Sequence, residues 1–96
     1  REASTIAPQS LTLLNGSLVR SEAQAAATRW TAQYAENAAL VNGAWRQVLA
    51  RPPAPDEAAR ALRFLAEQEK LGGSRQAAAM ELARALMNLN EFLYVD

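Results

Sequence analysis

The sequence predicts an all-α fold, a compact bundle of four to five short antiparallel helices. Alanine, the strongest helix former, supplies close to half of the apolar residues, which make up 50% of the 96 residues. Apolar residues also recur every three or four positions, which is the spacing of one helix face. Glycine and proline separate these stretches by short connections, and short connections favour antiparallel neighbours.

Residues 1–7 are predicted to form a linker, and residues 8–96 a single helical domain. The domain is expected to open with a short helix, because Pro8 suits a first helical turn and Asn15-Gly16 suits a helix end. The same Asn-Gly pair is the strongest signal for a two-residue hairpin turn. A hairpin over residues 12–19 is therefore an alternative that the sequence leaves open.

The second helix is predicted to follow Ser17, a favourable N-cap, and to end near Glu36-Asn37. The polar residues Arg20, Gln24 and Thr31 are expected to face water. One continuous apolar stripe should face the core, and it consists of Val19, Ala23, Ala26, Ala27, Trp30 and Tyr34.

The third helix is predicted from about Ala38 to Ala50. Asn42-Gly43 interrupts its pattern, and a glycine inside a helix costs roughly 1 kcal/mol relative to alanine. Either the helix starts late with Asn42 as its cap, or Gly43 allows another helix to approach closely. The expected apolar face consists of Val41, Ala44, Trp45, Val48 and Leu49.

Residues 51–55 contain three prolines and must break the helix. Pro55 then suits the first position of a fourth helix, in which Asp56 and Glu57 complement the positive end of the helix dipole. The segment Gly72-Gly73 should end this helix. Its buried face is predicted to consist of Ala58, Ala61, Leu62 and Leu65.

Ser74 is the predicted cap of a fifth helix that extends toward the end of the sequence. Its apolar residues Ala79, Leu82, Leu86, Leu89 and Leu93 repeat at intervals of three and four. The last six residues are unusually apolar for a chain end, and we expect them to dock onto the body of the domain.

Composition excludes several classes of function. The chain carries ten basic and ten acidic residues, so a general polyanion binder is not expected, and neither is nucleic acid as a partner. It contains no cysteine and no histidine, which excludes thiolate or imidazole metal sites, c-type haem attachment, disulfides and Ser–His–Asp catalysis within this sequence. No apolar run reaches the length of a membrane span. No cofactor is expected.

The candidate polar sites have simpler structural interpretations. Asp56 and Glu57 suit helix-dipole compensation, while Glu67 and Glu69 point about 200° apart around a helix and cannot converge. Trp30 and Trp45 lie on apolar stripes and are expected in the core. Four arginines lie in or near residues 51–55, which we call the proline corner: Arg46, Arg51, Arg60 and Arg63. They suggest a weak nucleic-acid or acidic-partner site as a less favoured hypothesis.

No catalytic, cofactor-binding or metal-binding residue is therefore predicted. Arg51 is expected to cap carbonyls at the end of the third helix or to pair with Glu57. Asn88 and its neighbours combine weak helix formers with an aromatic end, which favours contact with backbone or with a neighbouring domain. The predicted interface residues are Arg51, Glu57, Asn88, Asn90, Glu91, Phe92 and Tyr94.

Three stretches, in order, resemble a planctomycete domain family of unknown function. Residues 4–15 (STIAPQSLTLLN) are similar to the family pattern ST-x-APQ-x-L-x-LLN, and residues 49–57 (LARPPAPDE) to L-x-RPP-x-x-E. Residues 86–96 (LMNLNEFLYVD) are similar to the closing pattern LLN-x-NEFLYVD. Ala54 departs from the family pattern, which often has Thr or Ser there, and a missing cap of this kind costs about 1 kcal/mol.

The resemblance implies the C-terminal part of large proteins that also carry a planctomycete cytochrome c domain, and an extracytoplasmic or periplasmic setting. It supplies no catalytic residues. Because the sequence begins with Arg1, we interpret it as a fragment of a longer polypeptide. The leading hypothesis is a non-catalytic helical module that packs against upstream domains. The alternative is an accessory subdomain that completes an active site, related to polysaccharides, whose catalytic groups lie upstream.

Overall fold

The computed structural model describes the backbone of residues 19–95 and the side chains of residues 19–89. This range forms four helices: α2 (Val19–Gln33), α3 (Asn37–Leu49), α4 (Pro55–Gly72) and α5 (Arg75–Val95). The described residues contain no strand, which confirms the all-α prediction. The helix and hairpin alternatives for residues 8–19, and the cap at Ser17, fall largely or wholly outside the described residues.

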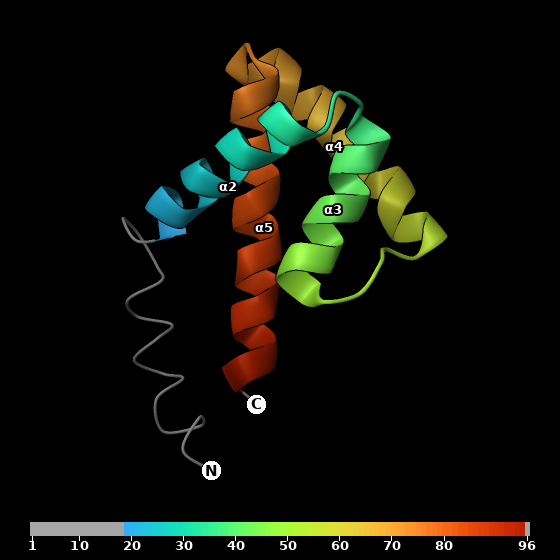
Figure 1. Cartoon of the computed structure of the whole chain (residues 1–96), viewed down its shortest axis with the longest axis vertical. Coiled ribbons are helices and arrows are strands. Elements are labelled where there is room, and N and C mark those ends of the chain that lie inside the picture. Colours follow the sequence, from blue (N-terminus) through green and yellow to red (C-terminus); the bar gives the residue numbers. More distant parts are fainter. Residues whose placement is uncertain (1–18, 96) are drawn as a thin grey trace.

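Helix α5 is the centre of the arrangement. It contacts each of the other three helices. In Figure 1, α2 lies across the upper half of α5, while α3 and α4 lie together to one side. Helix α3 also contacts each of the other helices, so the core lies among all four, with the most extensive contacts between α5 and its neighbours α2 and α4.

The helix ends follow the predicted chemistry. Pro55 is the first residue of α4 and Gly72 the last. Gly73 caps the helix end at a φ of 81°, and its N–H donates to Glu69 O over 2.8 Å. Ser74 caps α5, because its Oγ accepts a hydrogen bond from Ala77 N at 3.0 Å. Helix α2 ends at Gln33, a few residues before the predicted end.

The buried core combines a few large side chains with many alanines. Trp30, Leu40, Val41, Leu65 and Leu86 are almost completely buried. Burial of each such side chain contributes roughly 1.5–3 kcal/mol. Six further residues, at most 1% exposed, form what we call the alanine seam of α2 and α5: Ala23, Ala26, Ala27, Ala78, Ala79 and Ala83.

Two predicted core residues, Leu62 and Leu89, are exposed, and four more are only partly buried: Tyr34, Val48, Leu49 and Ala58. Leu62 is 37% exposed because the buried face of α4 centres on Ala61 and Leu65, and each residue turns the helix by about 100°. Leu89 is 52% exposed because it lies beyond the part of α5 that its neighbours cover. Thr31, predicted to face water, is half-buried, and its Oγ lies 2.9 Å from Oε1 of Gln76 on α5.

Helix α3 runs unbroken through Asn42-Gly43, which excludes a late start capped by Asn42. Asn42 instead accepts a hydrogen bond from Arg46 Nε at 2.7 Å. A Cβ at position 43 would lie 2.6 Å from Cε2 of Tyr34, far inside van der Waals contact. Gly43 therefore allows a close approach, as one alternative predicted, but the approaching group is the Tyr34 ring and not another helix.

Polar side chains fasten the helices across the core. Arg75, the first residue of α5, donates to Asn37 Oδ1 and to Tyr34 O, both at 2.8 Å, and so fixes the α2–α3 turn. Trp30 Nε1 donates to Gln47 Oε1 at 2.7 Å, which joins α2 to α3. A charge-assisted hydrogen bond typically contributes more than a neutral one.

The contact between Gly43 and Tyr34 predicts a non-additive pair of substitutions. Gly43→Ala should lower the free energy of unfolding by about 1–3 kcal/mol, because overpacking outweighs the gain in helix propensity. In a Tyr34→Ala background, Gly43→Ala should instead raise it, by up to about 1 kcal/mol. Urea denaturation of the four proteins measures both effects. Equal effects of Gly43→Ala in the two backgrounds would contradict the assigned contact.

Candidate functional site

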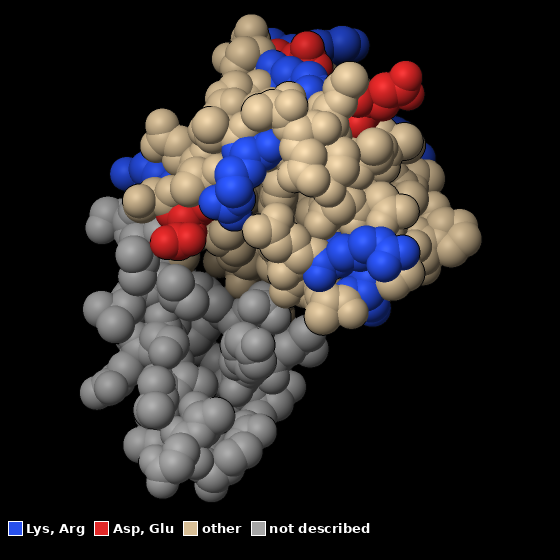
Figure 2. Space-filling model, in the orientation of Figure 1, with Lys and Arg blue, Asp and Glu red and all other residues tan. Residues whose placement is uncertain are grey.

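Charged side chains are scattered over the described surface. Figure 2 shows a few basic and acidic groups, some of them side by side, on a largely uncharged face. Of the arginines near the proline corner, Arg46 bonds to Asn42, and Arg51 and Arg60 lie near carboxylates of α4. Within residues 19–89, no group of three or more acidic residues is placed to hold a metal ion.

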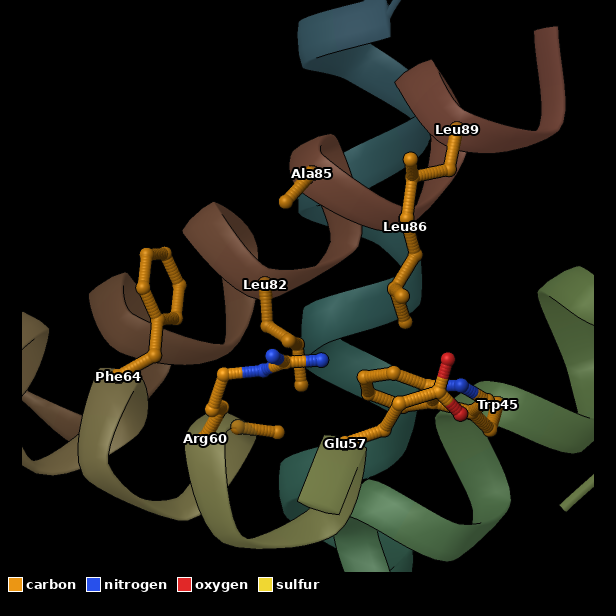
Figure 3. Close-up of a pocket in the computed structure, with 9 residues that line it drawn as sticks. Trp45, Glu57, Arg60, Phe64, Leu82, Ala85, Leu86 and Leu89 are labelled. Atoms are coloured by element: carbon orange, nitrogen blue, oxygen red, sulfur yellow. The ribbon is translucent and has the colours of Figure 1, made fainter. Parts of the chain in front are cut away.

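Three helices enclose an open groove with a volume of about 290 Å³, which we call the α3–α5 groove. Figure 3 shows its side chains converging from α3, α4 and α5. The lining is apolar apart from one carboxylate and one guanidinium. It consists of Trp45 from α3, of Glu57, Arg60, Ala61 and Phe64 from α4, and of Leu82, Ala85, Leu86 and Leu89 from α5.

The proline corner positions the carboxylate in this lining. Helix α3 ends at Leu49, and the next residue, Ala50, adopts a φ of 62° and donates its N–H to Arg46 O at 3.1 Å. The prolines then turn the chain into α4, whose third residue is Glu57. The Glu57 carboxylate accepts hydrogen bonds from Ala54 N at 2.8 Å, and from Arg51 Nη1 and Nη2 at 2.8 and 2.9 Å.

Position 54 supplies only half of a capping box. Its N–H is bonded by the Glu57 side chain, but alanine has no side-chain oxygen to return a bond to the first turn of α4. The first turn of α4 therefore lacks the side-chain bond that Ser or Thr would supply at this position. The bidentate hydrogen bonds from Arg51 to the Glu57 carboxylate also stabilise this end of α4.

The hydrogen bond from Arg51 is the largest cause that lowers the pKa of Glu57, which falls to about 2. The backbone N–H of Ala54 lowers this pKa further, while desolvation opposes the shift. The same hydrogen bond raises the pKa of Arg51. Glu57 is therefore ionised at neutral pH and cannot donate a proton there, which argues against a role as a general acid.

The buried indole N–H of Trp45 faces this carboxylate in Figure 3. It makes a small contribution to the lowered pKa of Glu57, although it forms no hydrogen bond of normal length among the described residues. Its ring closes one end of the α3–α5 groove. The indole therefore packs as a wall of the groove while its polar edge adjoins the ion pair.

The remaining charge in the groove is only weakly paired. Arg60 Nη2 lies 3.4 Å from Asp56 Oδ2, and the two side chains are 65% and 73% exposed. An exposed pair with this geometry contributes little. Asp56 is not a groove-lining residue, so the neighbouring carboxylates of α4 do not converge on one cleft.

Two of the predicted interface residues are in contact in the structure, and a third, Asn88, lies apart from them. Arg51 and Glu57 form the expected ion pair. Asn88 is exposed on α5 but does not line the groove. Asn90, Glu91, Phe92 and Tyr94 belong to α5, and their side chains lie outside the described residues.

Sequence reasoning missed the groove itself. Phe64 lies four residues after Arg60, and this spacing places both on one flank of α4, beside its buried face. That pattern was a usable signal for a partly exposed aromatic position. No comparable sequence pattern predicts the exposure of Leu89, because this exposure depends on where the neighbouring helices stop covering α5.

The comparisons with known proteins give one positive finding. The family model named PSD1, described as a protein of unknown function (DUF1553), matches residues 1–65, which include α2, α3 and the first part of α4. No curated protein and no solved structure matches the chain. Over the described residues, every helix is too short or too polar to cross a membrane.

The Arg51–Glu57 pair predicts a specific acid dependence of stability. The pKa of Glu57 is about 2 in the folded protein and 4.5 in its unperturbed state, so its contribution is complete above pH 4.5 and is lost as the pH falls toward 2. Glu57→Gln should remove this part of the dependence.

Urea denaturation between pH 2 and pH 7 measures this contribution. The stability difference between the wild type and Glu57→Gln should be constant near neutral pH and shrink toward zero near pH 2. Arg51→Gln should flatten the same region of the curve, because it removes the main cause of the shift. A Glu57→Gln curve parallel to that of the wild type would show that the pair does not form.

Proposed function

This chain belongs to the PSD1 family of proteins of unknown function (DUF1553), and we propose that it acts as a non-catalytic helical interaction module. The observation that carries the proposal is the α3–α5 groove, whose lining is open and mostly apolar. Among its apolar lining residues, Phe64 is partly exposed, and Ala85 and Leu89 are exposed. Apolar side chains left exposed around a concave surface are a feature of contact sites.

The chemistry of the groove supports binding more than catalysis. Its carboxylate is fixed in the ionised state by Arg51 and by the Ala54 N–H. Its one other charged group is Arg60, a guanidinium that stays protonated at physiological pH. Neither group has the second titratable partner that acid–base catalysis needs.

We further propose that the partner is another part of a longer polypeptide. This rests on the resemblance of residues 4–15, 49–57 and 86–96 to the C-terminal domain of planctomycete proteins that carry a cytochrome c domain. The same resemblance supports an extracytoplasmic setting. In this proposal the contact surface extends from the groove to the last turns of α5, with no nucleic acid and no membrane insertion.

The interface residues named from the sequence take two roles in this proposal. Arg51 and Glu57 hold the proline corner in place and so fix the position of α4 beside the groove. The other group lies on the C-terminal part of α5, next to or after Leu89, the last residue of the described groove lining. This second group consists of Asn88, Asn90, Glu91, Phe92 and Tyr94.

Two matched leucine substitutions test this function. Leu89 lines the groove and is 52% exposed, whereas Leu71 lies outside it at the end of α4 and is 80% exposed. In the isolated chain, Leu89→Glu and Leu71→Glu should each change the free energy of unfolding by about 1 kcal/mol or less. In the longer polypeptide, only Leu89→Glu should lower the melting temperature and speed proteolysis of the module.

Thermal denaturation and limited proteolysis of both forms supply the comparison. The isolated chain shows whether a substitution harms the fold itself, and Leu71→Glu shows the effect of a new surface charge alone. If Leu89→Glu were as harmless in the longer polypeptide as Leu71→Glu, the groove would not be a contact surface and the proposed function would fail.

A further inference from the structure

We draw no further inference here: the strongest candidate, the α3–α5 groove with the exposed side chains of Ala85 and Leu89 in its lining, belongs to the site already described, and nothing in the structure shows what covers it.

Discussion

The close approach of α2 and α5 through alanine is the constraint on which the rest of the structure depends. Ala23, Ala26 and Ala27 on α2, and Ala79 and Ala83 on α5, are completely or almost completely buried. Each contributes little apolar area, so their value is geometric: they let the two helices pack tightly and bring larger side chains into contact. Wider residues here would separate α2 from the helix that every other element contacts.

This packing determines where the candidate site lies. Helix α5 is held on one side by the alanine seam, and its other side carries Leu82 and Leu86 into the core against α3 and α4. The proline corner then sets the second wall, because Arg51 and the Ala54 N–H fix Glu57 at the start of α4. The groove is what remains where three helices diverge, so its shape follows from helix placement and not from a flexible loop.

The boundaries of α4 and the start of α5 could be predicted from local sequence, because Pro55, Gly73 and Ser74 act through their own backbone or side-chain bonds. Burial was predicted correctly along the middle of each apolar stripe. At the margins of the stripes the prediction was wrong, as at Leu62 and Leu89, which are exposed. The contacts of Arg75 and Tyr34 join segments about 40 residues apart, and no local pattern encodes them. The groove depends on the same long-range placement, which explains why composition and periodicity did not reveal it.

The alanine seam can be tested by adding the same side chain on two faces of α2. Ala27 is completely buried and Ala25 is exposed, two residues earlier in the same helix. Urea denaturation should show that Ala27→Leu lowers the free energy of unfolding by about 1–3 kcal/mol or more, while Ala25→Leu changes it by less than about 0.5 kcal/mol. Equal, small effects of the two substitutions would show that α2 and α5 do not depend on close alanine packing.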